Sequence, residues 1–527
     1  MLEADYIIVG AGTAGCVLAN RLTACGRFTV LLLEAGPSDT RLQIQLPIGY
    51  GMSFFDPAVN WMYRTEPEPA LQGRQGYWPR GKVLGGSSSI NAMVHVRGQD
   101  HDFDTWAEAG DSGWRADHLK AYFARADQIL SGADVSGQAH SLCKDFISAG
   151  EELGFAAEPD LSKVGADGVG YFRIAMRNGL RLSTARAYLR PAMKRQNLRV
   201  LTGAHATQIV MEGLHAKGVR FQQGSEMKSA FARGEVILAA GSINSPKLLQ
   251  LSGIGPAGTL KKHGIDVVVD RPGIGQNLQD HLCIDHVYKS RLPTLNQQLG
   301  PWFGKVKVAL RYALFRNGPL SLSVNQAGGF VRSRPGLDAP NMQLYFSPLS
   351  YTRTPPGVRP LMRPDTFPGF LLSAQPCRPT SRGYLEIASG DPAIPPKIVP
   401  NALATEFDIG EIIEGSCLLR QLAATGPLRN VIETELQPGG NVISDADLLA
   451  DIRQRASTVF HPVSTCRMGQ NEQVDVVDAG LRVYGVEGLR IVDASIFPSI
   501  PSGNTNAPTM MVAEKGADLI LGKGVPS

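Results

Sequence analysis

DYIIVGAGTAGCVLANRL, residues 5–22, decides the fold of the N-terminal part of this chain. An apolar run at residues 6–9 suits a buried parallel strand. Three glycines spaced GxGxxG follow it, and residues 13–22 then place apolar side chains at helical intervals. A second apolar run, FTVLLLEAG at residues 28–36, contains Glu34 near its end. The order of strand, glycine turn, helix, strand and acidic residue predicts a βαβ unit that binds a dinucleotide.

Each part of this unit has a physical role. Gly10 permits the tight turn, Gly12 lets the backbone approach a pyrophosphate, and Gly15 lets the helix pack on the strand. The helix N-terminus faces the anion, and Glu34 accepts a hydrogen bond from a ribose hydroxyl. The neighbouring residues that we assign to the same site are Thr13, Ala14 and Ala35. NAD and FAD share this fingerprint, so the nucleotide stays open at this point.

The composition is that of an ordinary globular protein. The 527 residues are 43% hydrophobic and 19% charged, and 52 basic against 48 acidic residues give a net charge of +4. The chain has no dense Lys/Arg run, so the sequence does not predict a nucleic-acid partner. The length predicts two or more joined domains.

Cysteine usage and the N-terminus bear on location. Seven scattered cysteines without a CxxC pair argue against a disulfide framework and a zinc site. We therefore expect no metal centre and a reduced, cytoplasmic protein. Glu3 and Asp5 stand where a signal peptide would carry basic residues, and no run of about 20 apolar residues predicts a transmembrane helix. Peripheral membrane association stays open, and so does the oligomeric state, monomer or dimer.

Two further glycine-rich segments are not generic loops. WPRGKVLGGSSSINAMVHVRG, residues 78–98, supplies backbone N–H groups and hydroxyls around Gly85 and Ser87, which suit an anion-binding nest. GEVILAAGSINSPKLLQLSGIG, residues 234–255, predicts a strand over residues 236–240 and a helix over residues 246–251 that starts at Pro246. RPGIGQNLQDHL follows at residues 271–282.

These segments resemble the two signature motifs of the glucose–methanol–choline (GMC) oxidoreductases, a family of FAD-dependent enzymes that oxidise alcohols. The second signature agrees at every defined position, from Gly241 to Gly255. The first agrees except at His95, where an aromatic residue or alanine is usual. Within the family, the chain is most similar to the bacterial choline-dehydrogenase-like alcohol dehydrogenases. The resemblance implies FAD, a small-molecule alcohol as substrate, and oxygen or a quinone or artificial compound as electron acceptor.

The resemblance also implies an α/β fold, α+β overall. It has a Rossmann-like FAD-binding domain and a substrate domain built on an antiparallel sheet flanked by helices. We expect the FAD domain at residues 1–125, 195–285 and 456–527, with connecting and cap segments at 126–194. Short apolar runs between Pro- and Gly-rich turns favour the antiparallel sheet at residues 286–455. These runs are GGFVRS, NMQLYFSPL, GFLLSAQP and GYLEIAS, and helices are expected at residues 407–424 and 445–457.

TVFHPVSTCRMG, residues 458–469, contains one histidine between an apolar run and a proline. On position alone, His461 is a structural core histidine. However, oxidation of an alcohol needs a base with a pKa near the working pH, and histidine is the usual choice. The segment matches the family motif His-Pro-x-x-Thr-x-x-Met-Gly, which implies that His461 is the general base. The resemblance further implies that Asn504 hydrogen-bonds the substrate oxygen, with Asn506 as the rival assignment.

The C-terminal segment VDASIFPSIPSGNTNAPTMMVAEKGADLI predicts a helix over residues 509–521, with Asn506 as N-cap, Pro508 in the first turn and Gly522 as the stop. Its N-terminus is expected to face the flavin pyrimidine. The resemblance puts Asn91 and Ala92 near flavin N5, and Asp493 near the ribityl–pyrophosphate linkage; a helix-capping role for Asp493 is the alternative. The remaining residues assigned to the cofactor are Met93, Val94, Ala206, Ala494 and Thr509.

The mode of FAD attachment follows from the residue before Asn91. In some relatives a histidine there bonds covalently to the flavin, whereas here it is Ile90, which has no nucleophile. We therefore expect non-covalent FAD, with His95 as the one candidate that could still reach the ring. A neutral primary, aromatic or polyol alcohol is the expected substrate, and the candidates for an apolar pocket are Phe54, Phe55, Tyr345, Phe346, Tyr351 and Phe367. A flavin-containing lyase of the hydroxynitrile-lyase type and a non-catalytic flavin-binding protein are the alternatives.

Overall fold

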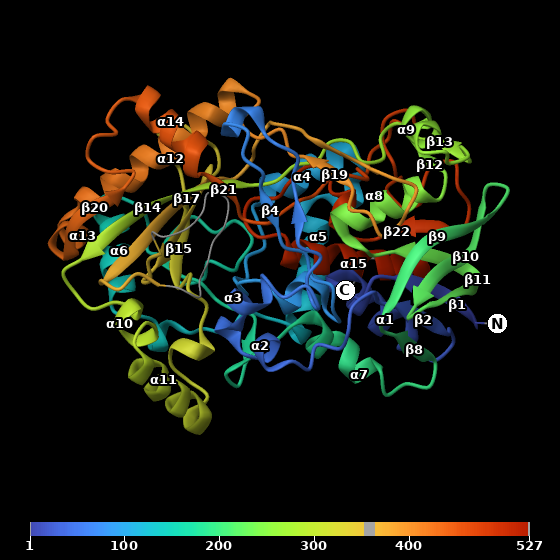
Figure 1. The fold of residues 1–527 in the computed structure, drawn as a ribbon, viewed down its shortest axis with the longest axis horizontal. Helices are drawn as coiled ribbons and strands as arrows, with labels where there is room; N and C mark the ends of the chain where they lie inside the picture. Colours follow the sequence, from blue (N-terminus) through green and yellow to red (C-terminus); the bar gives the residue numbers. More distant parts are fainter. Residues whose placement is uncertain (1, 352–363, 525–527) are drawn as a thin grey trace.

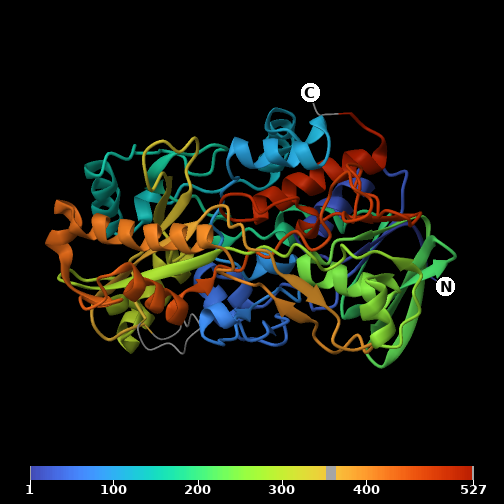
Figure 2. The same ribbon diagram turned by 90° about the horizontal axis from the view of Figure 1, so that it is seen from above.

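Two seven-stranded sheets lie at opposite ends of the elongated molecule (Figures 1 and 2). The computed structural model describes residues 2–351 and 364–524. The first described strand of the chain lies at the end that carries the first sheet, and the last helix lies in the same half of the molecule. The predicted α/β fold, with a Rossmann-like part and an antiparallel sheet flanked by helices, is confirmed.

The first sheet contains the predicted βαβ unit. Its strand order is β8 (Leu198–Leu201), β2 (Val30–Leu33), β1 (Leu2–Val9), β11 (Glu226–Leu238), β10 (His215–Gln223) and β9 (Ala204–Glu212), and β22 (Leu489–Ile491) also pairs with β11. The strands β8, β2, β1, β11 and β22 are parallel, and β10 and β9 continue the sheet in antiparallel fashion. Ile7, Ile8 and Val9 at the end of β1 are buried, as expected for a parallel strand with both faces of the sheet covered.

Helices from distant parts of the chain pack against this sheet. α15 (Asn506–Leu521) contacts both α1 (Thr13–Thr23) and α5 (Ala116–Ile129), and side chains from all three belong to one hydrophobic core. Other helices in this half are α4 (Asp100–Ala109), α7 (Arg190–Ala192), α8 (Gly241–Leu251) and α9 (Ala257–Lys262). The C-terminal segment therefore returns to the N-terminal βαβ unit, which places the start of α15 beside the glycine turn.

The second sheet is antiparallel throughout. Its order is β20 (Ile432–Gln437), β14 (Leu282–Ser290), β17 (Gly369–Pro376), β16 (Met342–Ser347), β15 (Ala327–Val331) and β5 (Gly168–Tyr171), and β21 (Ser457–Thr458) pairs with β14. The helices of this half are α6 (Leu142–Glu152), α10 (Leu295–Leu299), α11 (Trp302–Phe315), α12 (Glu406–Ala424), α13 (Gly426–Val431) and α14 (Asp445–Arg455). Leu418, Leu419 and Leu422 of α12 pack on the sheet residues Leu344 and Leu372 in a second core.

Four two-stranded pairs complete the described sheets. The two-stranded pairs are β3 (Tyr63–Arg64) with β4 (Tyr77–Trp78), β6 (Met176–Arg177) with β7 (Leu180–Arg181), β12 (Ile254–Gly255) with β13 (Val269–Asp270), and β18 (Tyr384–Glu386) with β19 (Lys397–Val399). Two short helices, α2 (Leu42–Gln45) and α3 (Tyr50–Ser53), precede them. Two strands of the second sheet extend beyond the range 286–455 that we expected for the substrate domain. β5 comes from the expected connecting segment 126–194, and β14 starts before residue 286.

Three local predictions were wrong. Among the described residues, the run GYLEIAS contains β18, which pairs with β19 and does not join the large antiparallel sheet. α8 starts at Gly241 and not at Pro246, which lies inside the helix. Proline leaves the carbonyl four residues earlier without its helical donor, and the Thr465 hydroxyl donates to that Ser242 oxygen at 2.6 Å. α15 begins at Asn506 itself, so Thr505 and not Asn506 is the N-cap.

Within the described residues, no helix has the length and apolar character needed to cross a membrane.

Candidate active site

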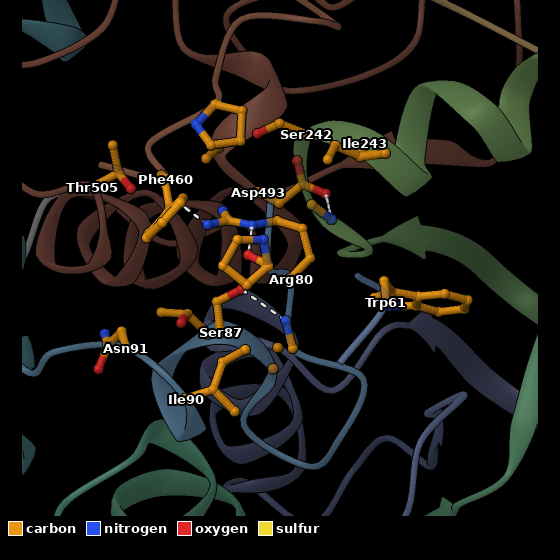
Figure 3. Close-up of a pocket in the computed structure, with 18 of the residues that line it drawn as sticks. Trp61, Arg80, Ser87, Ile90, Asn91, Ser242, Ile243, Phe460, Asp493 and Thr505 are labelled. Atoms are coloured by element: carbon orange, nitrogen blue, oxygen red, sulfur yellow. Dashed lines mark hydrogen bonds between the residues drawn. The ribbon is translucent and has the colours of Figure 1, made fainter. Parts of the chain in front are cut away.

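A cavity runs between the glycine turn of the βαβ unit and the second sheet. One end of it is formed by Gly10, Gly12, Thr13 and Ala14, and His461 lines the other end. Figure 3 shows Ser87, Ile90 and Asn91 along one side of the cavity, with Phe460 and Thr505 across from them.

The glycine turn has the geometry that the sequence predicted. Gly10 has φ +99°, a left-handed conformation that glycine adopts without strain. A Cβ atom on Gly15 would lie 1.9 Å from the Gly10 oxygen, so helix and turn could not pack as they do with a larger residue. Gly12 faces the cavity. The atom nearest to a Cβ added at Gly12 would be the Ala239 oxygen, 3.8 Å away. Backbone can therefore approach a ligand at Gly12.

Glu34 is held by backbone groups at the end of β2. Its Oε2 accepts from the Ala11 N–H at 2.9 Å, and its Oε1 accepts from the Gly36 N–H at 2.8 Å. Burial raises the pKa of Glu34 to about 7, although these two hydrogen bonds oppose the shift. Each carboxylate oxygen has a second lone pair, and Glu34 lines the cavity. It can therefore accept a hydrogen bond from a ribose hydroxyl as well.

Two helix N-termini open into the cavity. α1 and α15 have no side-chain cap and no acidic residue in their first turns. The Thr13 hydroxyl of α1 donates to Asn506 Oδ1 of α15 at 2.8 Å, which ties the two ends together across 493 residues of sequence. Unpaired N–H groups and the positive ends of the helix dipoles make this a favourable place for an anion.

The Gly/Ser-rich segment forms a short 3₁₀ turn, η3 (Gly86–Ser89), at the end of the cavity where the glycine turn lies. Gly86 approaches so closely that a Cβ atom there would lie 2.7 Å from the Gly12 Cα. Ser87 lines the cavity, and its hydroxyl accepts from the Gly81 N–H at 3.2 Å (Figure 3). The backbone of this turn and that of Gly12 therefore form two walls of one anion-binding cradle.

Asp493 both caps a helix and lines the cavity. Its Oδ1 accepts from the Ser495 N–H at 2.8 Å, at the start of η8 (Ala494–Ile496). Its Oδ2 accepts from the Gly241 N–H at 2.8 Å and from the Ser245 hydroxyl at 2.6 Å, at the start of α8 (Figure 3). The capping role and the cavity position expected from the sequence therefore occur together.

His461 lies between an amide and a second histidine. Asn504 Nδ2 is 3.1 Å from His461 Nε2, and His281 Nδ1 is 3.0 Å from His461 Nδ1. The other nitrogen of His281, Nε2, is 2.8 Å from the backbone oxygen of Cys377. His281 is fully buried and His461 is 7% exposed, whereas both His461 and Asn504 line the cavity.

These contacts fix the proton positions on both rings. A carbonyl oxygen can only accept, so His281 Nε2 carries its proton. Burial lowers the pKa of His281 to about 4, so the ring is neutral and its Nδ1 has a free lone pair. That lone pair accepts from His461 Nδ1–H. The remaining nitrogen of His461, Nε2, is then unprotonated and accepts from the Asn504 amide, at the cavity surface.

A chain of amides orients Asn504 from the other side. The Tyr345 hydroxyl donates to Gln375 Oε1 at 3.0 Å, and Gln375 Nε2 donates to Gln343 Oε1 at 3.2 Å. Gln343 Nε2 in turn lies 3.5 Å from Asn504 Oδ1. Since the oxygen of Asn504 faces Gln343, its NH₂ group must face His461 and the cavity.

Two charged residues support the loop that carries His461. Asp280 Oδ1 accepts from the His461 backbone N–H at 2.7 Å, and the Thr458 hydroxyl donates to Asp280 Oδ2. Arg80 donates to the Phe460 oxygen at 2.6 Å (Figure 3). Burial, followed by the adjacent His281 and the positive charge of Arg80, holds the pKa of His461 well below its usual value near 6.5. The His461 ring is therefore uncharged at neutral pH.

Most of the assigned cofactor residues line this one cavity. Three do not: Gly15, Gly85 and Pro508 lie behind its surface. The two asparagines separate, because Asn504 contacts His461 and Asn506 contacts Thr13. His95 also lies outside the lining. It is buried, and its Nε2 is 3.5 Å from Asp127 Oδ1.

Sequence reasoning missed several lining residues and the histidine that contacts His461. The lining residues that it missed include Trp61, Arg80, His205, Asn244 and Lys247. Arg80 and His281 stand in the quoted segments WPRG and NLQDHL, but nothing in their spacing connects them to His461. Of the aromatic candidates, Phe54, Tyr345 and Tyr351 line the cavity, together with Tyr50 and Phe460. Phe346 belongs to the second core, and Phe55 and Phe367 are not part of the lining.

Comparison with known proteins places the chain in a family. Models of the GMC oxidoreductase N-terminal and C-terminal regions match residues 4–283 and 379–513. The chain belongs to the GMC oxidoreductases. It is therefore an FAD-dependent enzyme that oxidises the CH–OH group of an alcohol, and both the predicted family and the predicted cofactor are confirmed.

Similar GMC oxidoreductases act on different alcohols. The chain is 41% identical over 540 residues to an oxygen-dependent choline dehydrogenase of Vibrio vulnificus, covering 98% of this chain and 94% of that one. It is 40% identical to an alcohol dehydrogenase [acceptor] of Pseudomonas putida, covering 98% and 96%. The crystal structure of pyridoxine 4-oxidase from Mesorbium loti matches with a TM-score of 0.86 at 29% identity, covering 97% and 98%.

The residues of this GMC oxidoreductase fit FAD. The approach of Gly86 to Gly12 leaves the uncapped N-terminus of α1 and successive backbone N–H groups for the pyrophosphate. Glu34 faces the same space for a ribose, and the cavity continues past Asn91 and Ala92 to His461 for the ring. No group of three or more His, Cys, Asp or Glu residues in the described ranges could hold a metal ion.

Proposed function

We propose that His461 is the general base and Asn504 the oxygen-binding group in the oxidation of a neutral alcohol. The supporting observation is the unprotonated Nε2 of His461, held beside the Asn504 amide at the cavity surface. A histidine base must be both unprotonated and within reach of the proton that it removes. His461 meets both conditions, because its lowered pKa keeps it neutral and its Nε2 faces the cavity.

The two residues divide the chemistry of the hydroxyl group. The alcohol O–H donates to His461 Nε2, which takes the proton as the carbonyl forms. Asn504 has two amide hydrogens, so it can donate to the alcohol oxygen while its Oδ1 stays toward Gln343. This donor stabilises the negative charge that develops on the oxygen. The imidazolium that results keeps its Nδ1–H bond to His281.

FAD supplies the acceptor for the hydride that leaves the alcohol carbon. The protein's part is to place that carbon opposite Asn91 and Ala92. The N-terminus of α15 faces the same region, and its dipole favours negative charge there.

The charges of the cavity favour a neutral substrate. Among the described lining residues only Glu34 and Asp493 are acidic, and both lie against the glycine turns. Arg80 lies close enough to His461 to lower the pKa of that ring. Arg80 has its own carboxylate neighbour in Asp280, but a cationic alcohol would find no carboxylate in the described lining at this end of the cavity.

The shape of the substrate end points to an apolar body on the alcohol. Tyr50, Phe54, Tyr351 and Phe460 surround this end, with Val324 between them. Aromatic rings bind both apolar groups and quaternary ammonium ions, so choline is the second candidate. It is suggested by the rings and by the choline dehydrogenase relatives, whereas the charge of Arg80 opposes it.

Anaerobic mixing of the holoenzyme with a panel of alcohols tests the proposal. We expect benzyl alcohol or a primary alkanol to bleach the flavin faster than choline does. Faster bleaching by choline would contradict the neutral-substrate proposal. If no alcohol bleaches the flavin and the protein cleaves a cyanohydrin, it is a lyase. Neither activity would indicate a non-catalytic flavoprotein. Readmission of oxygen then separates an oxidase from a dehydrogenase that needs a quinone or artificial acceptor.

A further inference from the structure

α11 carries an apolar stripe on its outer face. Trp302, Val306, Leu310 and Leu314 follow one another at intervals of four residues, with Phe303 beside them, and all five side chains are exposed. Residues four apart lie on one face of a helix. The buried residues Gly304, Val308 and Tyr312 occupy the opposite face. The protein thus uses one side of α11 and leaves a complete hydrophobic side uncovered.

The helix is fixed in this orientation. Tyr312 is buried, and its hydroxyl donates to the Gly179 oxygen at 2.7 Å. α11 also contacts α10 and the 3₁₀ turn η7 (Pro319–Ser321). In Figure 1 it projects at the lower left, beyond the second sheet. The exposed stripe is therefore held outward and cannot turn inward to bury its apolar side chains.

Basic residues flank the stripe on both sides. At about 100° per residue, Lys307 and Arg311 fall on one side of the stripe and Lys305 falls on the other, and Arg316 follows the helix as its C-cap, with its guanidinium over the Tyr312 ring. All four are exposed, and none forms an ion pair with a described acidic residue. The surrounding stretch, residues 286–337, contains eight Lys or Arg residues and no Asp or Glu, although Lys289, Arg332 and Arg334 pair with carboxylates from other parts of the chain. This concentration contrasts with the nearly balanced charge of the whole chain.

We infer that α11 docks on an anionic lipid surface, with its apolar stripe inserted among the lipid chains and its basic residues at the headgroups. Trp, Phe and Leu on one face and Lys or Arg along its borders form the pattern of a helix that lies in the plane of a membrane interface. At 14 residues, α11 is too short to span a bilayer. A second copy of the chain is a poorer occupant, because pairing through the same stripe would bring the same cations together.

Docking would connect the lipid surface to the cavity. α11 contacts α10, and Leu295 of α10 packs in one cluster with Tyr50, Phe54 and Val324. These three residues line the substrate end of the cavity. An apolar alcohol or electron acceptor dissolved in the lipid would then enter the cavity close to the lipid layer that contains it.

Sedimentation of the FAD-loaded protein with vesicles tests the inference. We expect binding to vesicles of equal parts phosphatidylcholine and phosphatidylglycerol, and weaker binding at higher salt. The triple substitution Trp302→Ser, Phe303→Ser and Leu310→Ser removes most of the stripe. It should reduce the coefficient for partition of the protein from water to the vesicles about 10²-fold or more. The control is Ile443→Ser, since Ile443 and Trp302 are both 77% exposed but Ile443 precedes α14. It should bind as the wild type does.

The basic residues have their own test. Lys305→Gln with Lys307→Gln should weaken binding to the anionic vesicles about 25-fold, at roughly fivefold for each charge. The control pair Lys261→Gln and Lys262→Gln removes two exposed lysines from α9 and should have no effect. FAD content and melting temperature show that each variant is folded. Absence of wild-type binding, or equal binding by the stripe variant, would overturn the inference. A lipid-free dimer that the stripe variant dissociates would assign the stripe to a second copy instead.

Discussion

His281 and His461 meet through their Nδ1 atoms, 3.0 Å apart, with their rings nearly perpendicular at 87°. Only one of these two nitrogens can carry a proton in a hydrogen bond between neutral rings. The Cys377 oxygen behind His281 determines which of the two nitrogens carries the proton. It requires the proton of His281 on Nε2, so the Nδ1 of His281 is unprotonated and the Nδ1 of His461 is the donor. The backbone carbonyl of Cys377, which directly follows β17 of the second sheet, thereby determines which nitrogen of His461 has a free lone pair.

Replacement of the base gives the first prediction. His461→Ala should slow flavin reduction by the best alcohol about 10² to 10⁴-fold, which is the usual contribution of a positioned general base. Stopped-flow reduction under anaerobic conditions measures this rate, and the flavin spectrum confirms that FAD is still bound. A variant that reduces flavin as fast as the wild type would return His461 to a structural role.

The dependence of the rate on pH gives the second. His461 must be unprotonated to accept a proton, and burial keeps its pKa well below 6.5. Because the pKa is lowered, the neutral form persists as the pH falls through 6.5. The rate of flavin reduction should therefore stay level through this range and decline only in more acidic buffer. An apparent pKa of 6.5 or above for the loss of activity would contradict the assignment.

The positioning role of His281 gives the third. His281→Leu removes the acceptor of His461 Nδ1–H, so the proton is no longer held on that nitrogen. We expect about a tenfold loss in the rate of flavin reduction, the value of one buried hydrogen bond. His281→Gln supplies an amide oxygen in place of the imidazole lone pair and should recover part of the rate.

A purely structural role for His281 predicts a different pattern. The leucine and glutamine variants would then differ in melting temperature while their rates and pH profiles matched the wild type. Equal rates in all three proteins would show that the tautomer of His461 does not depend on His281.

The two asparagines give the fourth. Asn504→Ala removes the donor beside His461 Nε2, whereas Asn506→Ala removes the acceptor of the Thr13 hydroxyl. Loss of a donor to the developing oxyanion costs about 3 kcal/mol, so Asn504→Ala should slow flavin reduction much more. Asn506→Ala should instead weaken FAD retention. The reverse ranking of reduction rates, with FAD bound in both, would exchange the two roles.

Local patterns in the sequence were enough for the βαβ unit. The glycine spacing, the apolar strand before it and Glu34 after it all concern neighbours in the chain, and steric rules decide their arrangement. The same holds for the runs that became β15, β16 and β17, which show apolar residues between turn signals.

Contacts between distant residues could not be predicted in this way. α8 begins five residues before Pro246 because Thr465, far along the chain, supplies the missing donor to Ser242. His281 was quoted within NLQDHL, but its partner lies 180 residues away. Asn504 and Asn506 do not face the same way, since Thr505 between them is helical with φ −87° and ψ −5° and not extended.

The attachment of FAD gives the last prediction. Ile90 lines the cavity at the position where some relatives carry a histidine, and its side chain cannot form a bond to the ring. His95, the alternative, is buried outside the lining, with its Nε2 toward Asp127. Cys16 lies in α1, where its thiol donates to the Ala11 oxygen at 3.2 Å. Burial also raises the pKa of this thiol, which suppresses the nucleophilic thiolate.

FAD should therefore be held by backbone contacts at α1 and η3, by the ribose contact with Glu34 and by burial of its ring. A cofactor held in this way is released when the fold is lost. After denaturation in acid or guanidinium, filtration should leave the visible flavin absorbance in the filtrate and a colourless chain on the filter. A yellow denatured chain would disprove non-covalent binding, and mass spectrometry of its peptides would then locate the bond, with the peptide that contains His95 as the first to be examined.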